Sequence, residues 1–249
     1  MEYLAIIPAR YASTRFPGKP LAMIAGKTMI QRVYEQASLA FQDVYVATDH
    51  PGIFDAVTAF GGRVVMTSAS HPNGTSRVYE AMQKIEKLRG TFCKYVINVQ
   101  GDEPFIKPEQ LKELAECFQN PQTEIATLKK KITNPKELSD PSTPKVVCAN
   151  NGKALYFSRA TIPFLRDIPQ QKWLEEHSFF KHIGLYGYKR ETLAQIAALD
   201  SGTLEKAENL EQLRWLENDI TIMVRETPYE SQSVDRPEDI EELKMDGII

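Results

Sequence analysis

The first 120 residues alternate between short apolar runs and longer stretches in which apolar side chains recur at helical spacing. Met29, Val33 and Ala37, for example, are four residues apart and would share one face of a helix. Short apolar runs bounded by polar or glycine residues instead predict buried strands. The pattern predicts strands at residues 4–8, 44–47, 63–66 and 95–99 and helices at residues 29–40, 53–60, 75–88 and 108–118. This alternation indicates a parallel sheet with helices on both faces.

The pattern changes after about residue 120, where predicted strands follow one another more closely. The predicted strands are residues 125–132, 145–149, 155–158, 182–188 and 220–224, the predicted helices are residues 191–198, 204–216 and 237–243, and residues 170–180 are extended or mixed. Additions of this kind to an α/β core often build a lid, a substrate pocket or a dimer arm. There is no internal repeat and no clear linker, so we predict one mixed α/β domain over residues 1–249.

The charge of the chain argues against one class of partner. The chain has 249 residues, with 30 Lys and Arg against 33 Asp and Glu, and a formal net charge of −3. A protein that binds nucleic acid through its phosphates needs a basic surplus to release counterions. We therefore expect no nucleic-acid partner, and any phosphate chemistry has to come from a local cluster of cations.

Neither a membrane segment nor a disulfide framework is indicated. No segment approaches the roughly 18 apolar residues of a membrane helix, and the first residues lack the positive leader of a signal peptide. Cys93, Cys117 and Cys148 are scattered without CxxC spacing, so we expect neither disulfides nor a structural zinc site. This composition predicts a cytoplasmic protein that does not bind a membrane.

The loop after the first predicted strand, residues 9–19, carries Arg10, Arg15 and Lys19 together with hydroxyl groups and a glycine. Open parallel sheets bind ligands outside the carboxyl ends of their strands, where this loop must lie. Backbone amides, guanidinium groups and ammonium groups are what a triphosphate needs. The alternative interpretation is a solvated basic loop that packs on acidic neighbours.

Two aspartates are candidates for a metal site. Asp102 follows the predicted strand at residues 95–99 and a glycine that permits close backbone approach, so its carboxylate could hold Mg²⁺ between phosphates. Asp235 lies just before the predicted helix at residues 237–243. Each also has a structural interpretation, because Asp102 could shape a turn and Asp235 is a good N-cap.

Two further clusters suit a nucleoside and a sugar acid. Residues 71–77 form a glycine turn into a helix, and their hydroxyl and amide groups suit a base or ribose, although a plain turn and cap is the alternative. Later segments supply Arg, His, Tyr, Glu and Gln side chains, which suit a polyhydroxylated acid. By pattern alone, His182 and Tyr186 are more typical of residues at the edge of a core.

Longer motifs carry a resemblance to a known family. The segments IPARYASTRFPGKPL (7–21), ATDH (47–50), NGTSR (73–77), NVQGDEP (98–104), ALYFSRA (154–160) and LEQLR (210–214) together resemble the 3-deoxy-manno-octulosonate cytidylyltransferases, or CMP-KDO synthetases. The similarity runs from about residue 3 to residue 243 and is far more specific than any short pattern above. The chain departs from many relatives at Ser76 and Phe164, and most along residues 166–181.

The resemblance implies both a fold and a reaction. The fold is a Rossmann-like, mixed and mostly parallel sheet of the nucleotide-diphospho-sugar transferase type, with an inserted substrate and dimerisation arm at about residues 133–181. The reaction transfers CMP from CTP to the anomeric hydroxyl of 3-deoxy-D-manno-octulosonate (KDO), releases pyrophosphate and gives CMP-KDO for lipopolysaccharide synthesis. The resemblance also implies Mg²⁺ as cofactor and a homodimer.

The resemblance, joined to the chemistry of the side chains, gives each residue a role as a hypothesis. The implied catalytic residues are Arg10, Lys19, Asp102 and Asp235, of which Asp102 and Asp235 would hold Mg²⁺. The implied nucleotide-binding residues are Ala9, Arg10, Ser13, Arg15, Lys19, Thr75 and Gln100. The implied sugar-acid residues are Gln100, Arg159, His182, Tyr186, Glu211 and Gln212.

Three other functions stay open at this point. The first is a cytidylyltransferase for another sugar acid, such as sialic acid or the 8-amino analogue of KDO. The second is a nucleotide-sugar glycosyltransferase, which would release no pyrophosphate from CTP. The third is a non-catalytic nucleotide-binding module, which would bind CTP without turnover and would not need both Asp102 and Asp235.

Overall fold

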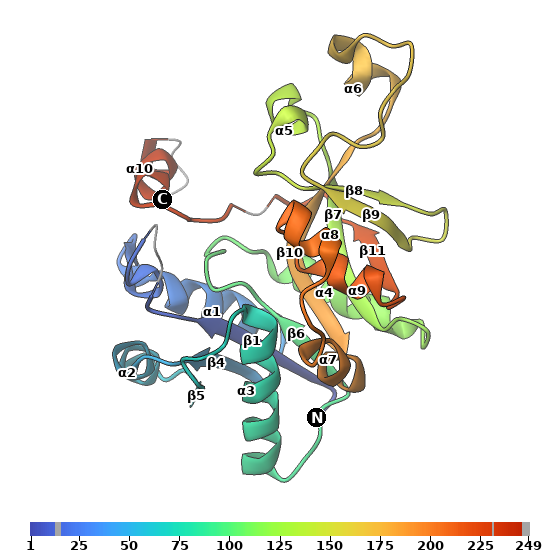
Figure 1. The fold of residues 1–249 in the computed structure, drawn as a ribbon. Coiled ribbons are helices and arrows are strands. Elements are labelled where there is room, and N and C mark those ends of the chain that lie inside the picture. The colour runs from blue at the N-terminus through green and yellow to red at the C-terminus, as the bar shows by residue number, and fades with distance from the viewer. Residues whose placement is uncertain (13–15, 231, 246–249) are drawn as a thin grey trace. The chain divides into compact units, whose positions relative to one another are not determined.

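The computed structural model describes residues 1–12, 16–230 and 232–245 (Figure 1). The chain divides into two compact units, one formed by Met1–Lys112 with Ser231–Ile249 and the other by Glu113–Glu230. The boundary falls within helix α4 (Pro108–Glu116), which a 3₁₀ turn at Cys117–Gln119 extends. The single domain expected over residues 1–249, with an arm at about residues 133–181, stays a prediction.

The first unit contains a parallel sheet in which the opening strand is central. Its strand order is β6-β1-β4-β5, and every neighbouring pair is parallel. The strands are β1 (Tyr3–Ala9), β4 (Val44–Thr48), β5 (Val64–Met66) and β6 (Tyr95–Asn98), which confirms the four strands predicted for this region. Residues 4–7 of β1 are fully buried, as expected of a strand covered on both faces.

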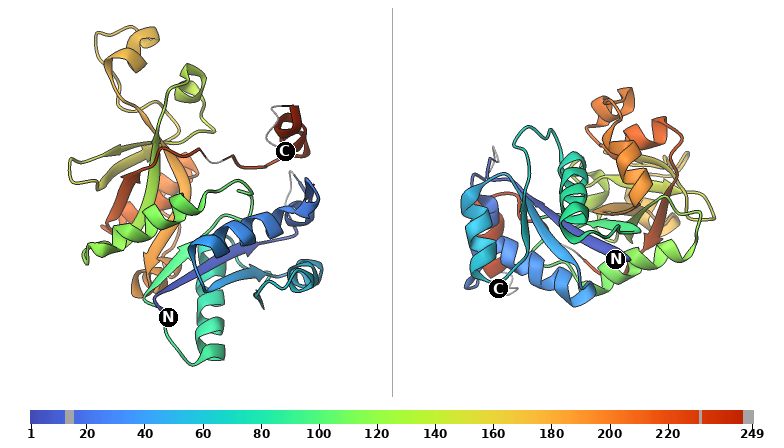
Figure 2. Two further views of the ribbon diagram at one scale, coloured as in Figure 1. Left: turned by 180° about the vertical axis from the view of Figure 1, so that it is seen from behind. Right: turned by 90° about the horizontal axis from the view of Figure 1, so that it is seen from below.

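Helices cover both faces of this sheet. The chain moves outward from β1 to β4 and β5, then returns past β1 to β6. Right-handed crossovers therefore place α1 and α2 on one face and α3 on the other, which the views in Figure 2 let the reader follow. The helices and their capping side chains are α1 (Met29–Ala40) with Thr28, α2 (Pro51–Ala59) with His50, and α3 (Gly74–Arg89) with Asn73. Each cap accepts a backbone N–H of the first turn, which explains where the predicted helices begin.

The last described residues belong to the first unit. The Val234 N–H donates to the Asp102 carbonyl at 2.9 Å, which fixes the segment before α10 (Pro237–Met245) beside the loop that follows β6. Asp239 accepts the backbone N–H groups of residues 235 and 236 and so caps this helix. A small core contains Ile24, Met29, Val234, Ile240 and Leu243. The segment therefore packs against the start of the chain, including the hairpin β2 (Met23–Ile24) and β3 (Lys27–Thr28).

The second unit contains a mixed set of strands. β7 pairs with β11 in parallel and with β10 in antiparallel fashion, and β8 is antiparallel to both β9 and β10. The strands are β7 (Ile125–Lys131), β8 (Lys145–Cys148), β9 (Ala154–Ser158), β10 (Phe180–Lys189) and β11 (Ile222–Glu226). Within the predicted arm lie α5 (Pro135–Ser139), which the sequence pattern did not predict, and α6 (Trp173–Glu176) after a 3₁₀ turn at Gln170–Lys172.

One predicted helix is wrong in its extent. Residues 204–216 form two helices, α8 (Thr203–Glu208) and α9 (Gln212–Glu217), instead of one. Asn209 has φ of 50° in the left-handed region, which ends α8, since asparagine tolerates this conformation at a helix C-terminus. The preceding helix α7 (Arg190–Ala197) agrees with the predicted one. None of the described helices is long and apolar enough to cross a membrane.

Candidate active site

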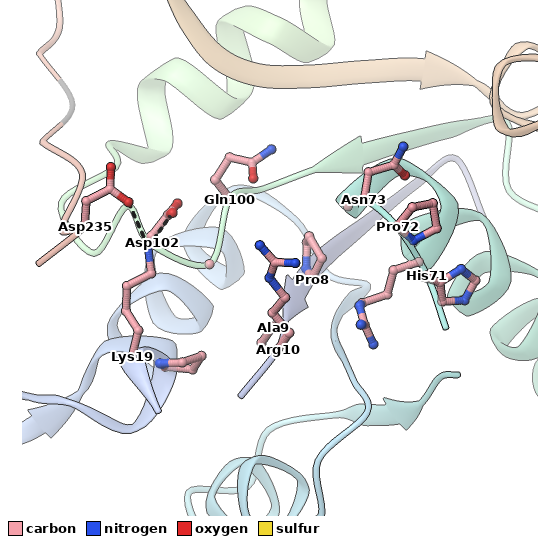
Figure 3. Close-up of a pocket in the computed structure, with 14 residues that line it drawn as sticks. Pro8, Ala9, Arg10, Lys19, His71, Pro72, Asn73, Gln100, Asp102 and Asp235 are labelled. Carbon is pink, nitrogen blue, oxygen red and sulfur yellow. Dashed lines mark hydrogen bonds and ion pairs between the residues drawn. The ribbon is translucent and has the colours of Figure 1, made fainter. Parts of the chain in front are cut away.

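A cavity of about 380 Å³ lies in the first unit at the carboxyl ends of β1 and β6 (Figure 3). The strand order reverses beside β1, and open α/β sheets bind ligands at such a reversal. Five short segments line the cavity, namely residues 8–10, 19–20, 71–74 with Arg77, 100–102, and Asp235. The predicted residues Ala9, Arg10, Lys19, Gln100, Asp102 and Asp235 are all among them.

The loop after β6 approaches β1 very closely. A Cβ atom on Gly101 would lie 2.7 Å from the Pro8 carbonyl oxygen, so a larger residue could not keep this backbone path. The glycine therefore allows Gln100 and Asp102, on either side of it, to lie at the end of β1. This confirms the expectation that Gly101 permits close backbone approach.

Lys19 joins the two predicted metal ligands. Its Nζ lies 2.7 Å from Asp102 Oδ2 and 3.1 Å from Asp235 Oδ1 (Figure 3). The Lys19 side chain is 14% exposed, whereas the Asp102 and Asp235 side chains are 33% and 37% exposed. The two carboxylates come from distant parts of the sequence, yet one ammonium holds both of them.

The carboxylate pair fits a magnesium ion in its chemistry. Mg²⁺ binds oxygen ligands at about 2.0–2.1 Å and is commonly held by one or two carboxylates plus substrate phosphates and water. Two oxygens on one such ion lie within about 4.2 Å of each other, and a shared ammonium already draws Asp102 and Asp235 together. The described residues contain no group of three or more His, Cys, Asp and Glu side chains suited to a metal. Phosphate and water oxygens would therefore have to complete the coordination.

Arg10 supplies a guanidinium to the predicted phosphate site. Arg10 is exposed at the end of β1, and Figure 3 shows its side chain between Lys19 and the segment 71–73. Ser13 and Arg15, both predicted nucleotide ligands, lie outside the described residues. The loop is anchored through Tyr11, whose ring stacks on His50 at a centroid distance of 4.1 Å and whose carbonyl accepts the Gly18 N–H at 3.0 Å.

The start of α3 forms the opposite wall. Thr75, predicted to bind the nucleotide, is buried in the first turn, and its role stays a prediction. Arg77 was not singled out from the sequence, although it lines the cavity. Its guanidinium donates to Asp49 Oδ2 at 2.6 Å and to Thr67 Oγ1 at 2.7 Å. The motifs that contain Asp49 and Arg77 were the signal that could have identified this pair.

His71, at the cavity edge, contacts the Glu80 carboxylate. Burial by itself would raise the pKa of Glu80. Hydrogen bonds from Lys84, the Ser68 N–H and His71 outweigh that effect and lower the pKa to about 2. Glu80 is therefore ionised at neutral pH and fixes the imidazole at the rim of the cavity.

The second unit brings together four of the predicted sugar-acid residues. The His182 ring lies 5.3 Å from the Tyr186 ring, and its Nε2 is 3.0 Å from Thr127 Oγ1. Burial lowers the pKa of His182 to about 3, so the imidazole is neutral. Burial, with smaller contributions from Tyr188 and the nearby Glu211 carboxylate, raises the pKa of Tyr186 well above its usual value.

Three buried polar atoms of this cluster have no hydrogen-bond partner among the described residues. They are the Tyr186 hydroxyl, Gln212 Nε2 and Trp215 Nε1. Tyr186 and Trp215 pack edge to face at 5.0 Å, and Gln212 lies one turn before Trp215 in α9. Buried polar atoms are almost always paired, so such a group of donors is suited to a polar ligand. Trp215 was missed from the sequence, because a tryptophan in an amphipathic helix predicts only a core residue.

Arg159 is the predicted sugar-acid residue with the most competing contacts. Its Nε, Nη1 and Nη2 donate to the carbonyl oxygens of Glu208, Pro141 and Asn209. Its backbone N–H donates to the Glu208 carboxylate at 2.9 Å. The guanidinium therefore holds the end of β9 to the end of α8, and its predicted part in binding a substrate carboxylate stays a prediction.

Comparison with known proteins shows the family of the chain. The Cytidylyltransferase family matches residues 4–222 of the chain. The 3-deoxy-manno-octulosonate cytidylyltransferase of Bacteroides thetaiotaomicron is 53% identical over 243 residues, covering 96% of each chain. The enzyme of the same name from Geobacter sulfurreducens is 46% identical over 255 residues, covering 98% of each.

Solved structures agree as well. A CMP:2-keto-3-deoxy-manno-octonic acid synthetase complexed with CTP aligns over 100% of both chains, with a TM-score of 0.90 and 39% identity. The 4-diphosphocytidyl-2C-methyl-D-erythritol synthase of Anaerococcus prevotii covers 100% of this chain and 97% of its own, with a TM-score of 0.63 and 11% identity, and so supports the fold alone.

The fold is that of an α/β nucleotidyltransferase, which confirms the fold class predicted from the sequence. Sequence identity then shows the family within this class. The chain belongs to the 3-deoxy-manno-octulosonate cytidylyltransferase family.

Proposed function

We propose that this chain transfers CMP from CTP to the anomeric hydroxyl of KDO, releases pyrophosphate and so supplies CMP-KDO for lipopolysaccharide synthesis. Family membership supports this activity. One observation of the site supports the proposed mechanism. Lys19, Asp102 and Asp235 converge in a cavity at the end of β1 that Arg10 also lines. The positive groups and the paired carboxylates are what an attack on a nucleoside triphosphate requires.

The reaction has to bring two anions together. A sugar acid approaches a triphosphate, and two like unit charges 4 Å apart repel by about 4 kcal/mol at an effective dielectric constant near 20. Arg10 and Lys19 would offset part of this repulsion at the phosphates. Ser13 and Arg15 would also bind the triphosphate. Asp102 and Asp235 would hold Mg²⁺, which when bound supplies neutralisation of phosphate charge and lowers the pKa of a coordinated hydroxyl. On this account no separate side-chain base is required.

The nucleoside part of CTP would lie between β1 and the start of α3. The backbone at Ala9, the side chain of Gln100 and the first turn of α3 at Thr75 supply polar groups for the base and ribose. Arg77 is held by Asp49, which keeps this wall rigid beneath the nucleotide. Positioning of the reacting groups would account for most of the remaining rate enhancement.

The sugar acid would bind to the donor cluster of the second unit. The neutral His182, the Tyr186 hydroxyl and Gln212 Nε2 would supply hydrogen bonds to hydroxyl groups of the substrate, and Glu211 would accept one. Arg159 would bind the substrate carboxylate after exchanging at least one of its three carbonyl partners. We also propose a homodimer formed through residues 133–181.

A pyrophosphate-release assay with CTP, Mg²⁺ and a panel of sugar acids tests this function. We expect release with KDO, little release without a sugar acid, and slower release with sialic acid. The 8-amino analogue of KDO belongs in the same panel. Faster release with another sugar acid would show that this acid, and not KDO, is the preferred substrate. CTP binding without any pyrophosphate release would favour a non-catalytic nucleotide-binding module.

A further inference from the structure

The Lys19 side chain has a place in this site that phosphate binding alone does not explain. Its ammonium lies between Asp102 and Asp235, at 2.7 Å and 3.1 Å, and it is less exposed than either carboxylate. Three separate segments meet there, namely the 3₁₀ turn at Lys19–Leu21, the loop after β6 and the segment before α10. The ammonium is therefore a cationic link among parts of the chain that are far apart in sequence.

Charge explains why a cation is needed at this point. The Val234 N–H donates to the Asp102 carbonyl, so the backbones that carry the two carboxylates are already joined. Two carboxylates held this close repel each other unless a positive charge lies between them. Lys19 supplies one positive charge against two negative ones, and the ion triplet keeps a net negative charge.

We propose that Lys19 is the internal counter-ion of the metal-free enzyme, in which its ammonium takes the position that a divalent cation takes between Asp102 and Asp235. This inference rests on the proposed function, because that function assigns the metal to these two aspartates. A divalent cation and the ammonium compete for the same carboxylate oxygens. The metal can bind both aspartates only after Lys19 has moved away.

Two consequences follow for the order of binding. The free enzyme binds divalent cations more weakly than it would without the Lys19 ammonium, because each binding event must break both Lys19 ion pairs. A triphosphate in the cavity offers the displaced ammonium new oxygen partners and so reduces this cost. Lys19 would thus form ion pairs with the aspartates before the substrate binds and with the phosphates afterwards.

The test is a titration of the protein alone with Mn²⁺, without nucleotide, in which the signal of free Mn²⁺ is followed by electron paramagnetic resonance. We expect Lys19→Met to bind Mn²⁺ about tenfold more tightly than the wild type, which corresponds to about 1.4 kcal/mol. Lys19→Gln, a second neutral variant, should behave in the same way. Lys19→Arg keeps the charge and should bind as weakly as the wild type.

The matched control is Lys27→Met, because Lys27 is an exposed lysine that pairs with Glu35 and does not line the cavity. This change should leave Mn²⁺ affinity unaltered. In EDTA, Lys19→Met should lower Tm by about 2 °C or more, since two carboxylates lose their counter-ion, and Mn²⁺ should restore it. Equal or weaker Mn²⁺ binding by both neutral variants would overturn the proposal, as would tight binding by Lys19→Arg.

A double variant separates this inference from the proposed function. Asp102→Asn added to Lys19→Met should abolish the gain in Mn²⁺ affinity, because it removes one of the two ligands. If the neutral variants gain no affinity while the wild type releases pyrophosphate from CTP and KDO, the counter-ion role fails and the proposed function stands. If the wild type releases no pyrophosphate with any sugar acid, the proposed function fails whatever the Mn²⁺ titration gives.

Discussion

Lys145 is a buried cation whose removal should be costly. Its side chain is fully buried at the start of β8, and its Nζ donates to the carbonyl oxygens of Asp140, Thr143 and Arg159 at 2.8, 2.7 and 3.0 Å. The first two carbonyls belong to the loop before β8, and the third follows β9. The ammonium therefore ties the base of the predicted arm to the residue expected to bind the substrate carboxylate.

Lys145→Met keeps most of the volume of the side chain and removes the three hydrogen bonds. Hydrogen bonds to a charged group contribute about 1.5–3 kcal/mol each, and relief from burying the ammonium offsets a large part of their sum. We expect a net loss of about 3 kcal/mol in the free energy of unfolding. For a chain of this length, that loss lowers Tm by about 6–12 °C.

Urea denaturation followed by circular dichroism measures this loss. Lys153→Met, at an exposed lysine in the turn between β8 and β9, is the control and should change stability by less than about 0.5 kcal/mol. Because the Arg159 carbonyl loses its contact with the Lys145 ammonium, Lys145→Met should also raise KM for KDO more than KM for CTP. A Lys145 variant as stable as the control would show that water replaces the ammonium without cost, and the reasoning would be refuted.

Three further changes test other parts of the site. Asp102→Asn should reduce kcat at least about 100-fold while circular dichroism stays unchanged, and near-normal activity at saturating Mg²⁺ would refute its role as a metal ligand. Glu80→Gln should lower the free energy of unfolding at pH 7 and make it depend less on pH in acid. The folded-state pKa of Glu80 is about 2, so its carboxylate stabilises the fold fully above about pH 4.5 and loses that effect as the pH falls towards 2. Equal slopes of stability against pH for wild type and variant would contradict this. Tyr11→Ala should raise KM for CTP severalfold. Tyr11→Phe keeps the ring that stacks on His50 and should leave KM unchanged. Equal KM values for the two variants would show that the stack does not position the loop.

Local sequence signals account for the parts of the fold that were predicted well. The helix at residues 29–40 has both a clear apolar face and a threonine cap, and the structure gives the same bounds. The predicted helix at residues 204–216 was wrong because periodicity does not register a single residue in the left-handed region, here Asn209. Helix α5 is five residues long and too short for a periodic pattern to be distinguished from a loop.

The site could be predicted as a set of residues but not as a set of interactions. Position after a strand was enough to indicate Arg10, Lys19 and Asp102, because parallel strands end at the same edge of the sheet. That one ammonium holds Asp102 and Asp235 depends on the packing of the last segment against the start of the chain, which no local pattern contains. The ion pair of Arg77 with Asp49 joins two motifs that were noticed separately, and only the fold brings them together.

In the proposed reaction, Asp102, Asp235 and the cations that follow β1 bring CTP and a sugar acid together. A crystal structure of the enzyme with CTP and Mn²⁺, in which anomalous scattering locates the metal, tests it most directly. We expect Mn²⁺ bound by Asp102 and Asp235, the triphosphate against Arg10, and the Lys19 ammonium turned from the carboxylates to phosphate oxygens. A nucleotide bound elsewhere, with neither aspartate on the metal, would contradict it.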